Sequence, residues 1–378
     1  MPKLLITANV AEMFRDFLLP YARYFRAQGW SVDAMANGIR NSGECAAAFD
    51  RVIDIRWSRD PFDVANMMHA SRQIAREIEL SGYDVIHAHT PIAGFISRMA
   101  ARRRVRRLPK VVYTAHGFHF HPHGRWLTNH IYRRLESMAG RWTDYLVVIN
   151  HTDEEAARKY EIVPADRLIY MPGIGIDLSR YRAANVSDTD VRTFRTELGL
   201  SEKNRIVLMI AEFTPVKRHC DAVRAFNLLR DTSTHLVFAG EGPLMSEIRQ
   251  LAQSLDLYRR IHFVGYRRDI PVLLRAAAAM ILPSEREGLP RSIMEALSVG
   301  TPVIASNIRG CRDLLAGGSG VLFPVGDYTC LSEAIGTILR DPANTAEMTQ
   351  RGRQTVERYD IRHILRLHET LYSRALAA

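Results

Sequence analysis

The feature that most constrains the fold is an alternation of short apolar runs with longer segments of helical periodicity, and it occurs twice along the chain. In the first half, the strand-like runs include Lys3–Ala8, Tyr83–His89, Lys110–Gly117 and Tyr145–Asn150. Parallel strands need long crossover connections, and helices are the usual ones. The alternation therefore predicts an α/β fold, with a parallel sheet covered by helices on both faces.

The pattern restarts at Arg205–Phe213, after the polar stretch Arg180–Leu200. The later strand-like runs are Thr234–Gly242, Arg260–Tyr266, Ala277–Ser284, Pro302–Ser306 and Gly320–Pro324. A chain of 378 residues is too long for one typical core. We predict two doubly wound domains, residues 1–183 and 184–360, and a last helix at about 361–378 that packs back on the first domain.

Composition limits the classes of partner. The net charge of +10 favours an anionic partner, but no zinc-finger spacing, RNA-binding aromatic signature or helix-turn-helix is present, so no nucleic acid is expected. No apolar run is long enough to cross a bilayer, and the first residues lack the pattern of a signal peptide. The scattered cysteines, Cys45, Cys220, Cys311 and Cys330, indicate free thiols in a reducing cytoplasm.

Open parallel sheets bind ligands at the carboxyl ends of their strands. One such end leads into the segment Glu287–Ser306, which holds two glutamates eight positions apart. Pro290 suits the start of a helix, so the amides of Gly288 to Arg291 are free donors for an anion or for sugar oxygens. Glu287 would stand before that helix and Glu295 two turns along it. The alternative is that Glu287 caps the helix and Glu295 is an ordinary acid on its face.

This segment resembles the E-x7-E motif of retaining glycosyltransferases of family 4, which have the GT-B fold of two facing Rossmann-like domains. The resemblance spans nearly the whole chain. Its other landmarks are Pro172–Asp177, Gly240–Leu244, Gly265–Ile270 and Gly320–Asp327.

The resemblance implies a role for each donor-site residue. Glu287 would contact the hydroxyls of the donor sugar, and Glu295 would accept hydrogen bonds from the nucleotide ribose. Lys217 would hold the diphosphate. The resemblance also places at the donor site Gly265, Tyr266, Gly288, Leu289, Pro290 and Arg291.

One position departs from the family pattern. Where the family has an arginine beside the diphosphate, five positions before the lysine, this chain has Glu212. Glu212 could turn away, it could orient Lys217 or Arg218, or another basic residue could supply the missing charge; we favour the second. The glycine-rich loop expected after the first strand is also absent, so phosphate binding from that side is in doubt.

Four histidines follow the strand-like run Lys110–Gly117, namely His116, His119, His121 and His123. No cysteine or acid stands nearby in ligand spacing, so a metal site is not expected. The resemblance places His116 near the transferred sugar and phosphate, as a catalytic residue together with Glu287 and Lys217. It assigns His119 to the acceptor. The Asp-x-Asp at Asp188–Asp190 lies in the polar junction and is not expected to bind metal.

The resemblance implies transfer of a hexosyl or N-acetylhexosaminyl unit from a nucleotide sugar, favoured to be a UDP-sugar, with retention and without a metal or other cofactor. The stretches His116–Phe120, Ile149–Glu155 and Asn307–Leu315 resemble bacterial members of the family that build surface polysaccharide on a polyprenyl-diphosphate lipid. This resemblance implies that the acceptor is a hydroxyl of a polyprenyl-diphosphate-linked saccharide. Two alternatives stay open: a sugar-nucleotide enzyme with a soluble acceptor, such as an epimerase or synthase, and a non-catalytic nucleotide-binding scaffold.

A basic run predicts peripheral attachment to the anionic inner face of the plasma membrane, with the protein otherwise cytoplasmic. Pro91–Ala100 has apolar residues on one face of an expected amphipathic helix. Trp126, Ile131 and Tyr132 could add apolar contact, although core packing is the favoured use of Ile131. The basic residues that follow Pro91–Ala100 are Arg102, Arg103, Arg104, Arg106 and Arg107.

Overall fold

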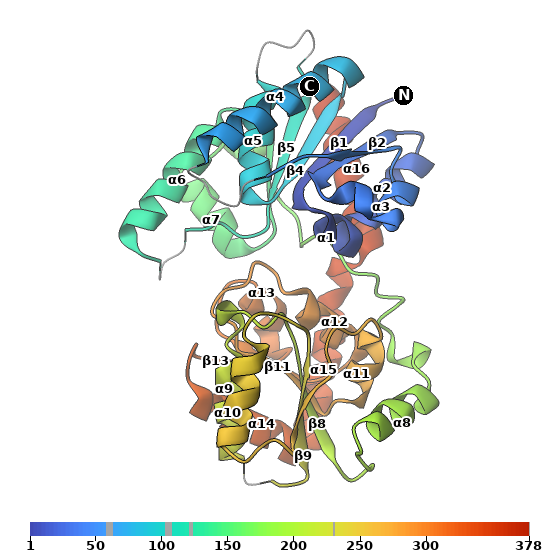
Figure 1. Ribbon diagram of the computed structural model, residues 1–378, viewed down its shortest axis with the longest axis vertical. Coiled ribbons are helices and arrows are strands. Elements are labelled where there is room, and N and C mark those ends of the chain that lie inside the picture. Colours follow the sequence, from blue (N-terminus) through green and yellow to red (C-terminus); the bar gives the residue numbers. More distant parts are fainter. Residues whose placement is uncertain (58–62, 103–107, 121–123, 230, 378) are drawn as a thin grey trace. The chain divides into compact units, whose positions relative to one another are not determined.

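The protein is described by a computed structural model over residues 1–57, 63–102, 108–120, 124–229 and 231–377 (Figure 1). The chain divides into two compact units. Unit 1 comprises Met1–Ile174 and Ile361–Ala378, and unit 2 comprises Gly175–Asp360. None of the helices in the described ranges is long and apolar enough to span a membrane.

Unit 1 contains a seven-stranded sheet in the order β3-β2-β1-β4-β5-β6-β7, and all its neighbouring strands are parallel. The strands are β1 (Lys3–Val10), β2 (Ser31–Asn37), β3 (Arg51–Asp54), β4 (Val85–His89), β5 (Lys110–Ala115), β6 (Tyr145–Val148) and β7 (Leu168–Tyr170). The helices are α1 (Ala11–Met13), α2 (Leu19–Ala27), α3 (Gly43–Ala48), α4 (Val64–Ser81), α5 (Pro91–Ala101), α6 (Trp126–Gly140), α7 (His151–Lys159) and α16 (Ile361–Ala377).

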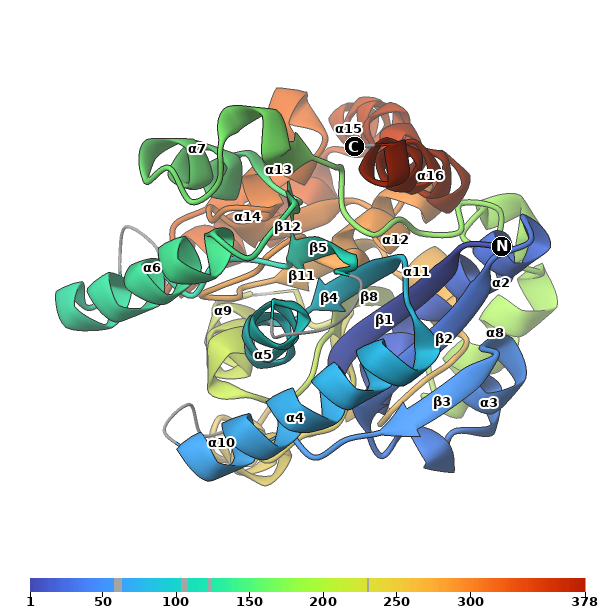
Figure 2. The ribbon, with the colours of Figure 1, turned by 90° about the horizontal axis from the view of Figure 1, so that it is seen from above.

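Both faces of this sheet are buried because successive side chains of a strand point to opposite faces. In β1, Leu4 and Ile6 join a cluster with α2, α3 and α16, whereas Leu5 joins a cluster with α4 and α5. Figure 2 shows α4 and α5 along one side of the sheet. The last helix, α16, contacts α2 and β4 and buries Leu371 and Tyr372.

Unit 2 repeats the architecture with a six-stranded parallel sheet in the order β10-β9-β8-β11-β12-β13. The strands are β8 (Arg205–Ile210), β9 (Thr234–Ala239), β10 (Ile261–Phe263), β11 (Ala279–Leu282), β12 (Val303–Ser306) and β13 (Val321–Phe323). The helices are α8 (Asp188–Glu197), α9 (His219–Leu228), α10 (Met245–Ser254), α11 (Ile270–Ala276), α12 (Arg291–Val299), α13 (Cys311–Leu315), α14 (Tyr328–Arg340) and α15 (Pro342–Val356). One core contains α8, α11 and α12, and the other contains α9, α10 and α14.

The boundary between the units differs from the one predicted after residue 183. Ile176 and Tyr181 are buried in a core of unit 2, and the backbone N–H of Ile176 donates to the carbonyl of Tyr359 at 3.0 Å. These contacts place the chain from Gly175 onward in unit 2. The polar stretch of the sequence begins only at Arg180, so the sequence pattern does not mark this boundary.

Candidate functional site

The donor-site residues of unit 2 lie on loops at the carboxyl ends of its strands. After β8, the chain makes a 3₁₀ turn at Pro215–Lys217, and after β11 it runs through Glu287 to the start of α12. The N–H of Glu285 donates to the carbonyl of Val216 at 2.8 Å, which ties the two loops together. Loops at this edge of a parallel sheet are the usual place for a ligand.

Lys217 and Glu287 form an ion pair across these two loops. Lys217 Nζ lies 2.6 Å from Glu287 Oε1, and both side chains are largely shielded from solvent. Arg309 Nε donates to the backbone carbonyl of Glu287 at 3.3 Å. A Cβ at Gly310, where φ is +74°, would stand 2.2 Å from the carbonyl oxygen of Gly288. Glycine at 310 thus lets two loops meet directly at the start of α12.

Glu295 is buried on the first turns of α12 and has two partners. Arg291 Nε donates to Glu295 Oε1 at 2.8 Å, and the nearby Tyr181 hydroxyl also stabilises the ionised carboxylate. Burial raises the pKa of Glu295, while Arg291 and Tyr181 oppose that rise. Burial also raises the pKa of the Tyr181 hydroxyl, so it remains a donor near neutral pH. Sequence reasoning missed Tyr181 because its segment reads as a polar junction.

Glu212 does not orient Lys217 or Arg218, so the favoured sequence interpretation is wrong. Glu212 is exposed, and within the described ranges its side chain has no hydrogen bond or ion pair. Lys217 pairs with Glu287, and Arg218 Nε lies 2.5 Å from Asp221 Oδ2. The alternative in which Glu212 turns away fits this structure best.

Two further predicted donor residues follow the end of β10. Gly265 has φ of +68°, and its carbonyl accepts from the N–H of Gly240 at 2.8 Å. Tyr266 is 60% exposed, and its N–H donates to Glu241 Oε1 at 3.4 Å. Gly265 and Tyr266 thus lie beside the loop that follows β9, at the carboxyl edge of the sheet. Leu289 and Pro290 precede α12, and Pro290 occupies its N-cap position.

In unit 1, His116 lies next to two other histidines. His89 ends β4, and its Nδ1 lies 2.9 Å from His116 Nε2. His87, two residues earlier, contacts the Tyr372 hydroxyl at 2.5 Å and Thr114 Oγ1 at 2.7 Å. His119 is half-buried, and its ring centroid is 5.1 Å from that of Tyr132. His121 and His123 lie outside the described residues.

Desolvation keeps the imidazoles of His87, His89 and His116 neutral. It lowers the pKa of His116 to about 4 and holds the pKa values of His87 and His89 well below the ordinary value. In the described ranges, no group of three His, Cys, Asp or Glu is arranged to hold a metal ion. Asp188 instead pairs with Arg275 at 2.6 Å, and the N–H of Asp190 donates to the capping hydroxyl of Ser187.

The predicted membrane helix is not exposed. The residues of α5 are buried or half-buried, and Ile96 and Ala100 lie in the core beneath α4. Arg102 Nη2 pairs with Asp144 Oδ2 at 2.7 Å. Arg103, Arg104, Arg106 and Arg107 lie outside the described residues. The expectation that the apolar face of Pro91–Ala100 lies at a membrane interface is therefore wrong, because the sheet and neighbouring helices cover that face.

Exposed apolar side chains occur on α6 instead, at an outer edge of unit 1 (Figure 1). Trp126 is 78% exposed, Leu127 61%, Ile131 44% and Met138 41%. The expectation that Ile131 packs in the core is wrong. Spacing alone could have revealed this face, since Leu127, Ile131 and Met138 recur at helical intervals.

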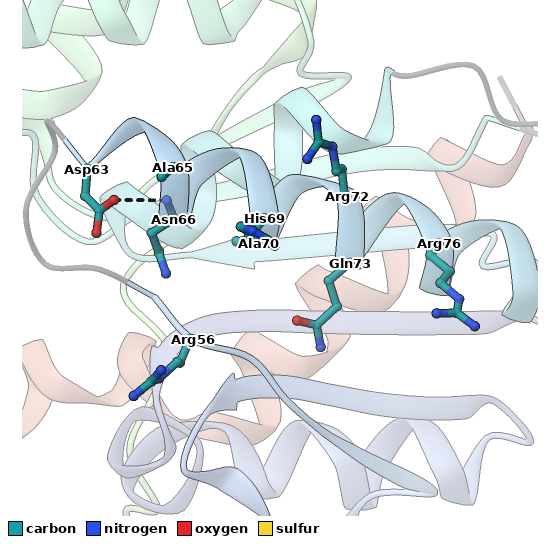
Figure 3. A pocket seen from close by; sticks show the side chains of 9 residues that line it. All are labelled: Arg56, Asp63, Ala65, Asn66, His69, Ala70, Arg72, Gln73 and Arg76. Carbon is teal, nitrogen blue, oxygen red and sulfur yellow. Dashed lines mark hydrogen bonds between the residues drawn. The ribbon is translucent and has the colours of Figure 1, made fainter.

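A separate groove of about 650 Å³ runs beside α4. Its lining includes Arg56, His69, Arg72, Gln73 and Arg76 (Figure 3). The side chains of Arg72 and Gln73 leave the helix in opposite directions. The basic groups do not converge on one point, so we assign the groove no ligand.

Comparison with known proteins identifies both halves of the chain. Residues 18–180 match the model of "Glycosyltransferase Family 4", and residues 190–355 match that of "Glycosyl transferases group 1". EpsD of Bacillus subtilis strain 168, which bears the name of a glycosyltransferase, is 33% identical over 94% of this chain and 92% of its own length. An Escherichia coli UDP-Gal:alpha-D-GlcNAc-diphosphoundecaprenol alpha-1,3-galactosyltransferase is 32% identical over 60% of this chain and 59% of its own length.

Solved structures confirm the fold class. Anabaena Alr3699/HepE in complex with UDP and glucose aligns with a TM-score of 0.81 and 21% identity, covering 99% of this chain and 100% of that one. Structural neighbours of this kind have the GT-B fold, in agreement with the expectation from sequence.

Proposed function

The chain belongs to the family 4 glycosyltransferases, and from this premise we propose that it transfers a hexosyl or N-acetylhexosaminyl unit from a UDP-sugar, with retention of configuration. The proposed acceptor is a hydroxyl of a polyprenyl-diphosphate-linked saccharide. The 32% identical relative from Escherichia coli, which is named for UDP-Gal and a diphosphoundecaprenol acceptor, supports both choices.

The observation that carries this proposal is the pairing of Lys217 with Glu287 in front of α12. A UDP-sugar offers a negative diphosphate to Lys217 and sugar hydroxyls to Glu287. The first-turn backbone N–H groups of α12 have no acceptor within the helix, so they add donors for an anion. Glu295 is the proposed acceptor of the ribose hydroxyls, held by Arg291 and Tyr181.

We propose that the chain itself stabilises the charge that develops on the departing diphosphate. Lys217 and the α12 amides supply positive charge and donors close to where that charge appears, which is the usual strategy of electrostatic catalysis. The neighbouring guanidinium of Arg309 lies within reach of the same loop. On this proposal no metal is required. The departing phosphate accepts the proton of the attacking hydroxyl on the same face, so retention needs no side-chain base.

The acceptor proposal places the enzyme at a membrane surface, and α6 is the element suited to meet it. Leu127, Ile131, Arg134, Met138 and Arg141 are all exposed. At 100° per residue they fall within an arc of about 80°. An apolar stripe that carries basic residues is typical of helices lying at an anionic lipid interface.

The distribution of charge on α6 also favours contact with an anionic surface. The helix contains one acid, Glu136, and its carboxylate turns inward to pair with buried Arg98 at 2.9 Å. The outward stripe therefore carries positive and apolar groups without a carboxylate. We propose peripheral binding to the anionic inner face of the plasma membrane through this stripe.

The testing experiment is a panel of nucleotide sugars incubated with purified protein, with and without a polyprenyl-diphosphate saccharide. Release of UDP that rises with the lipid acceptor, together with a lengthened saccharide of retained configuration, supports the proposal. Release that responds only to a water-soluble acceptor would replace the lipid acceptor. Binding of nucleotide without release from any sugar would revive a non-catalytic scaffold.

A further inference from the structure

Neighbouring histidine rings form a row that runs from the buried interior of unit 1 to half-buried His116. His368 of α16 stacks near His87, with ring centroids 5.5 Å apart, and His87 lies 4.2 Å from His89. His89 then contacts His116, with centroids 5.2 Å apart. His89 is fully buried, whereas His116 is half-buried, so His116 is the member of this last pair that a ligand can reach.

The contact between the last two rings joins one nitrogen of each. His89 Nδ1 and His116 Nε2 are 2.9 Å apart, and one of them must carry the shared proton. The other ring nitrogen of His89, Nε2, is buried and has no hydrogen-bond partner among the residues that the structure describes. Both rings are neutral near pH 7, because desolvation lowers their pKa values. Each ring therefore carries a single proton.

The shared proton can lie on His116 Nε2 or on His89 Nδ1, and the environment of His89 Nε2 decides between these two arrangements. If His116 donated from Nε2, His89 would hold its own proton on Nε2, as a buried N–H without an acceptor. If His89 donates from Nδ1, its Nε2 is only an unfilled acceptor. Buried donors without partners are rarer in proteins than under-satisfied acceptors. The second arrangement is therefore the stable one.

We infer that His89 is a positioning residue that fixes His116 as the Nδ1–H tautomer, so that His116 meets its ligand as a hydrogen-bond donor. The hydrogen bond made by one ring nitrogen sets the protonation of the other. The consequence for catalysis rests on the proposed function: Nδ1–H of His116 would donate to a sugar hydroxyl or phosphate oxygen and could not act as a base.

The ring of His89 is itself held in place by a neighbouring histidine. His87 is fixed by the Tyr372 hydroxyl of α16 on one nitrogen and by Thr114 on the other, and it packs against the His89 ring. The returning helix α16 thus limits rotation of His87, which in turn limits rotation of His89. In the sequence, His87 and His89 stand at the end of the strand-like run Tyr83–His89.

The first test is nitrogen-15 NMR of histidine-labelled wild-type protein, with the His116 signals assigned by their loss in His116→Gln. We expect a protonated Nδ1 and a bare Nε2 in His116. A proton on Nε2 of His116 in the wild type would overturn the inference. This measurement needs no substrate, so it remains decisive even if every nucleotide sugar fails as a donor and the proposed function is abandoned.

The second test compares His89→Asn, whose amide nitrogen can replace Nδ1 as donor, with His89→Leu, which cannot donate. We expect kcat to fall about tenfold in His89→Leu with a smaller change in KM, and to be largely restored in His89→Asn. The tautomer of His116 should become mixed only in His89→Leu. Wild-type kcat with an unchanged His116 spectrum in His89→Leu would contradict the assignment.

A matched control comes from a second pair of histidines. His235 Nδ1 and His262 Nε2 are 3.0 Å apart in unit 2, on β9 and β10. His262→Leu breaks a hydrogen bond of the same geometry outside the donor-site loops, and kcat should stay near that of the wild type. If His89→Leu does not fold, the wild-type spectrum and the His89→Asn kinetics still decide the question.

Discussion

Lys217 Nζ and Glu287 Oε1 lie 2.6 Å apart, although the two residues are 70 positions apart in the sequence. Each group therefore neutralises the charge that the other would offer to a ligand. A nucleotide sugar that binds as proposed must separate the pair, with the diphosphate replacing Glu287 as partner of the lysine. The pair thus keeps a cation and an anion in a shielded site without leaving either alone.

We expect Glu287→Gln to lower turnover strongly while leaving UDP affinity unchanged or slightly higher. The amide accepts sugar hydroxyls less well than a carboxylate, and charge-assisted hydrogen bonds contribute about 1.5–3 kcal/mol, or roughly 10- to 150-fold in rate. UDP lacks the transferred hexose that Glu287 would hold, and the substitution frees Lys217 from its ion pair. Calorimetry with UDP and initial rates with the donor measure the two effects.

Glu285→Gln is the matched control for that experiment. Glu285 lies on the same loop, its side chain is 61% exposed, and its carboxylate is 3.9 Å from Arg218. It should affect neither measurement much. A Glu287→Gln enzyme with full turnover would remove the assignment of Glu287 to the donor sugar.

Glu295→Ala should weaken UDP binding by about 1.5–3 kcal/mol through loss of charge-assisted bonds to the ribose. Tyr181→Phe should cost less, about 0.5–1.5 kcal/mol, because it removes one hydroxyl that orients the carboxylate. Calorimetry on both variants, with thermal unfolding to verify folding, tests the order. Equal UDP affinity of wild type and Glu295→Ala would remove the ribose assignment.

Glu212→Arg is now expected to keep activity and to bind UDP at least as tightly as the wild type. Glu212 is exposed and holds neither Lys217 nor Arg218, so its replacement breaks no ion pair in the described structure. An arginine there would add positive charge to the loop after β8 that holds Lys217, the proposed ligand of the diphosphate. Severe loss of kcat in a folded Glu212→Arg protein would return Glu212 to the catalytic machinery.

These sites show what sequence could and could not predict. The strand–helix alternation correctly predicted two parallel α/β domains, and strand ends correctly located the loops of Lys217 and Glu287. Periodicity could not tell which amphipathic helix is covered. It marked α5, whose apolar face is buried by the sheet, as the main contact, and it gave α6, whose Leu127 remains exposed, only a supporting part.

Pairing of charges is harder to predict, because it depends on where loops from distant strands meet. Lys217 could have paired with Glu212, five positions away, yet the loop after β11 brings Glu287 closer. Tyr181 reaches Glu295 only because its segment joins unit 2 ahead of the predicted boundary. Such contacts follow from packing rather than from local residue patterns.

The buried imidazoles predict a loss of stability in mild acid. Burial lowers the pKa of His368 to about 4 from its ordinary value of 6.5, and it also lowers those of His87 and His89. Between these values the unfolded chain binds protons that the folded chain does not, so stability falls as pH drops from about 6.5 toward 4. Urea unfolding between pH 7.5 and 4.5 measures this slope.

Two variants test whether buried histidines cause the slope. His368→Gln should flatten it, because the substituted side chain cannot be protonated in either state. His69→Gln, at an exposed position on α4, should leave it unchanged. A slope equally steep in His368→Gln and in the wild type would assign the acid sensitivity to other groups.

The last prediction concerns the stripe on α6. Leu127→Gln with Ile131→Gln should reduce binding to vesicles containing anionic lipid by roughly 30-fold, since transfer of each apolar side chain contributes on the order of 1 kcal/mol even when partly buried. Arg134→Gln with Arg141→Gln should weaken binding chiefly at low salt, because exposed charges are screened over about 10 Å at 0.1 M. Co-sedimentation at low and high salt is the measurement.

Leu80→Gln separates a specific stripe from general surface stickiness, because Leu80 is 70% exposed but lies on α4. It should sediment with vesicles as the wild type does. If the α6 variants also sediment normally while the five residues Arg102, Arg103, Arg104, Arg106 and Arg107 changed to glutamine abolish binding, the basic run and not α6 is the membrane contact. In either case donor hydrolysis without lipid should survive, since the altered residues lie in unit 1 and the donor-site residues in unit 2. Loss of hydrolysis together with vesicle binding would instead indicate misfolding, which circular dichroism would reveal.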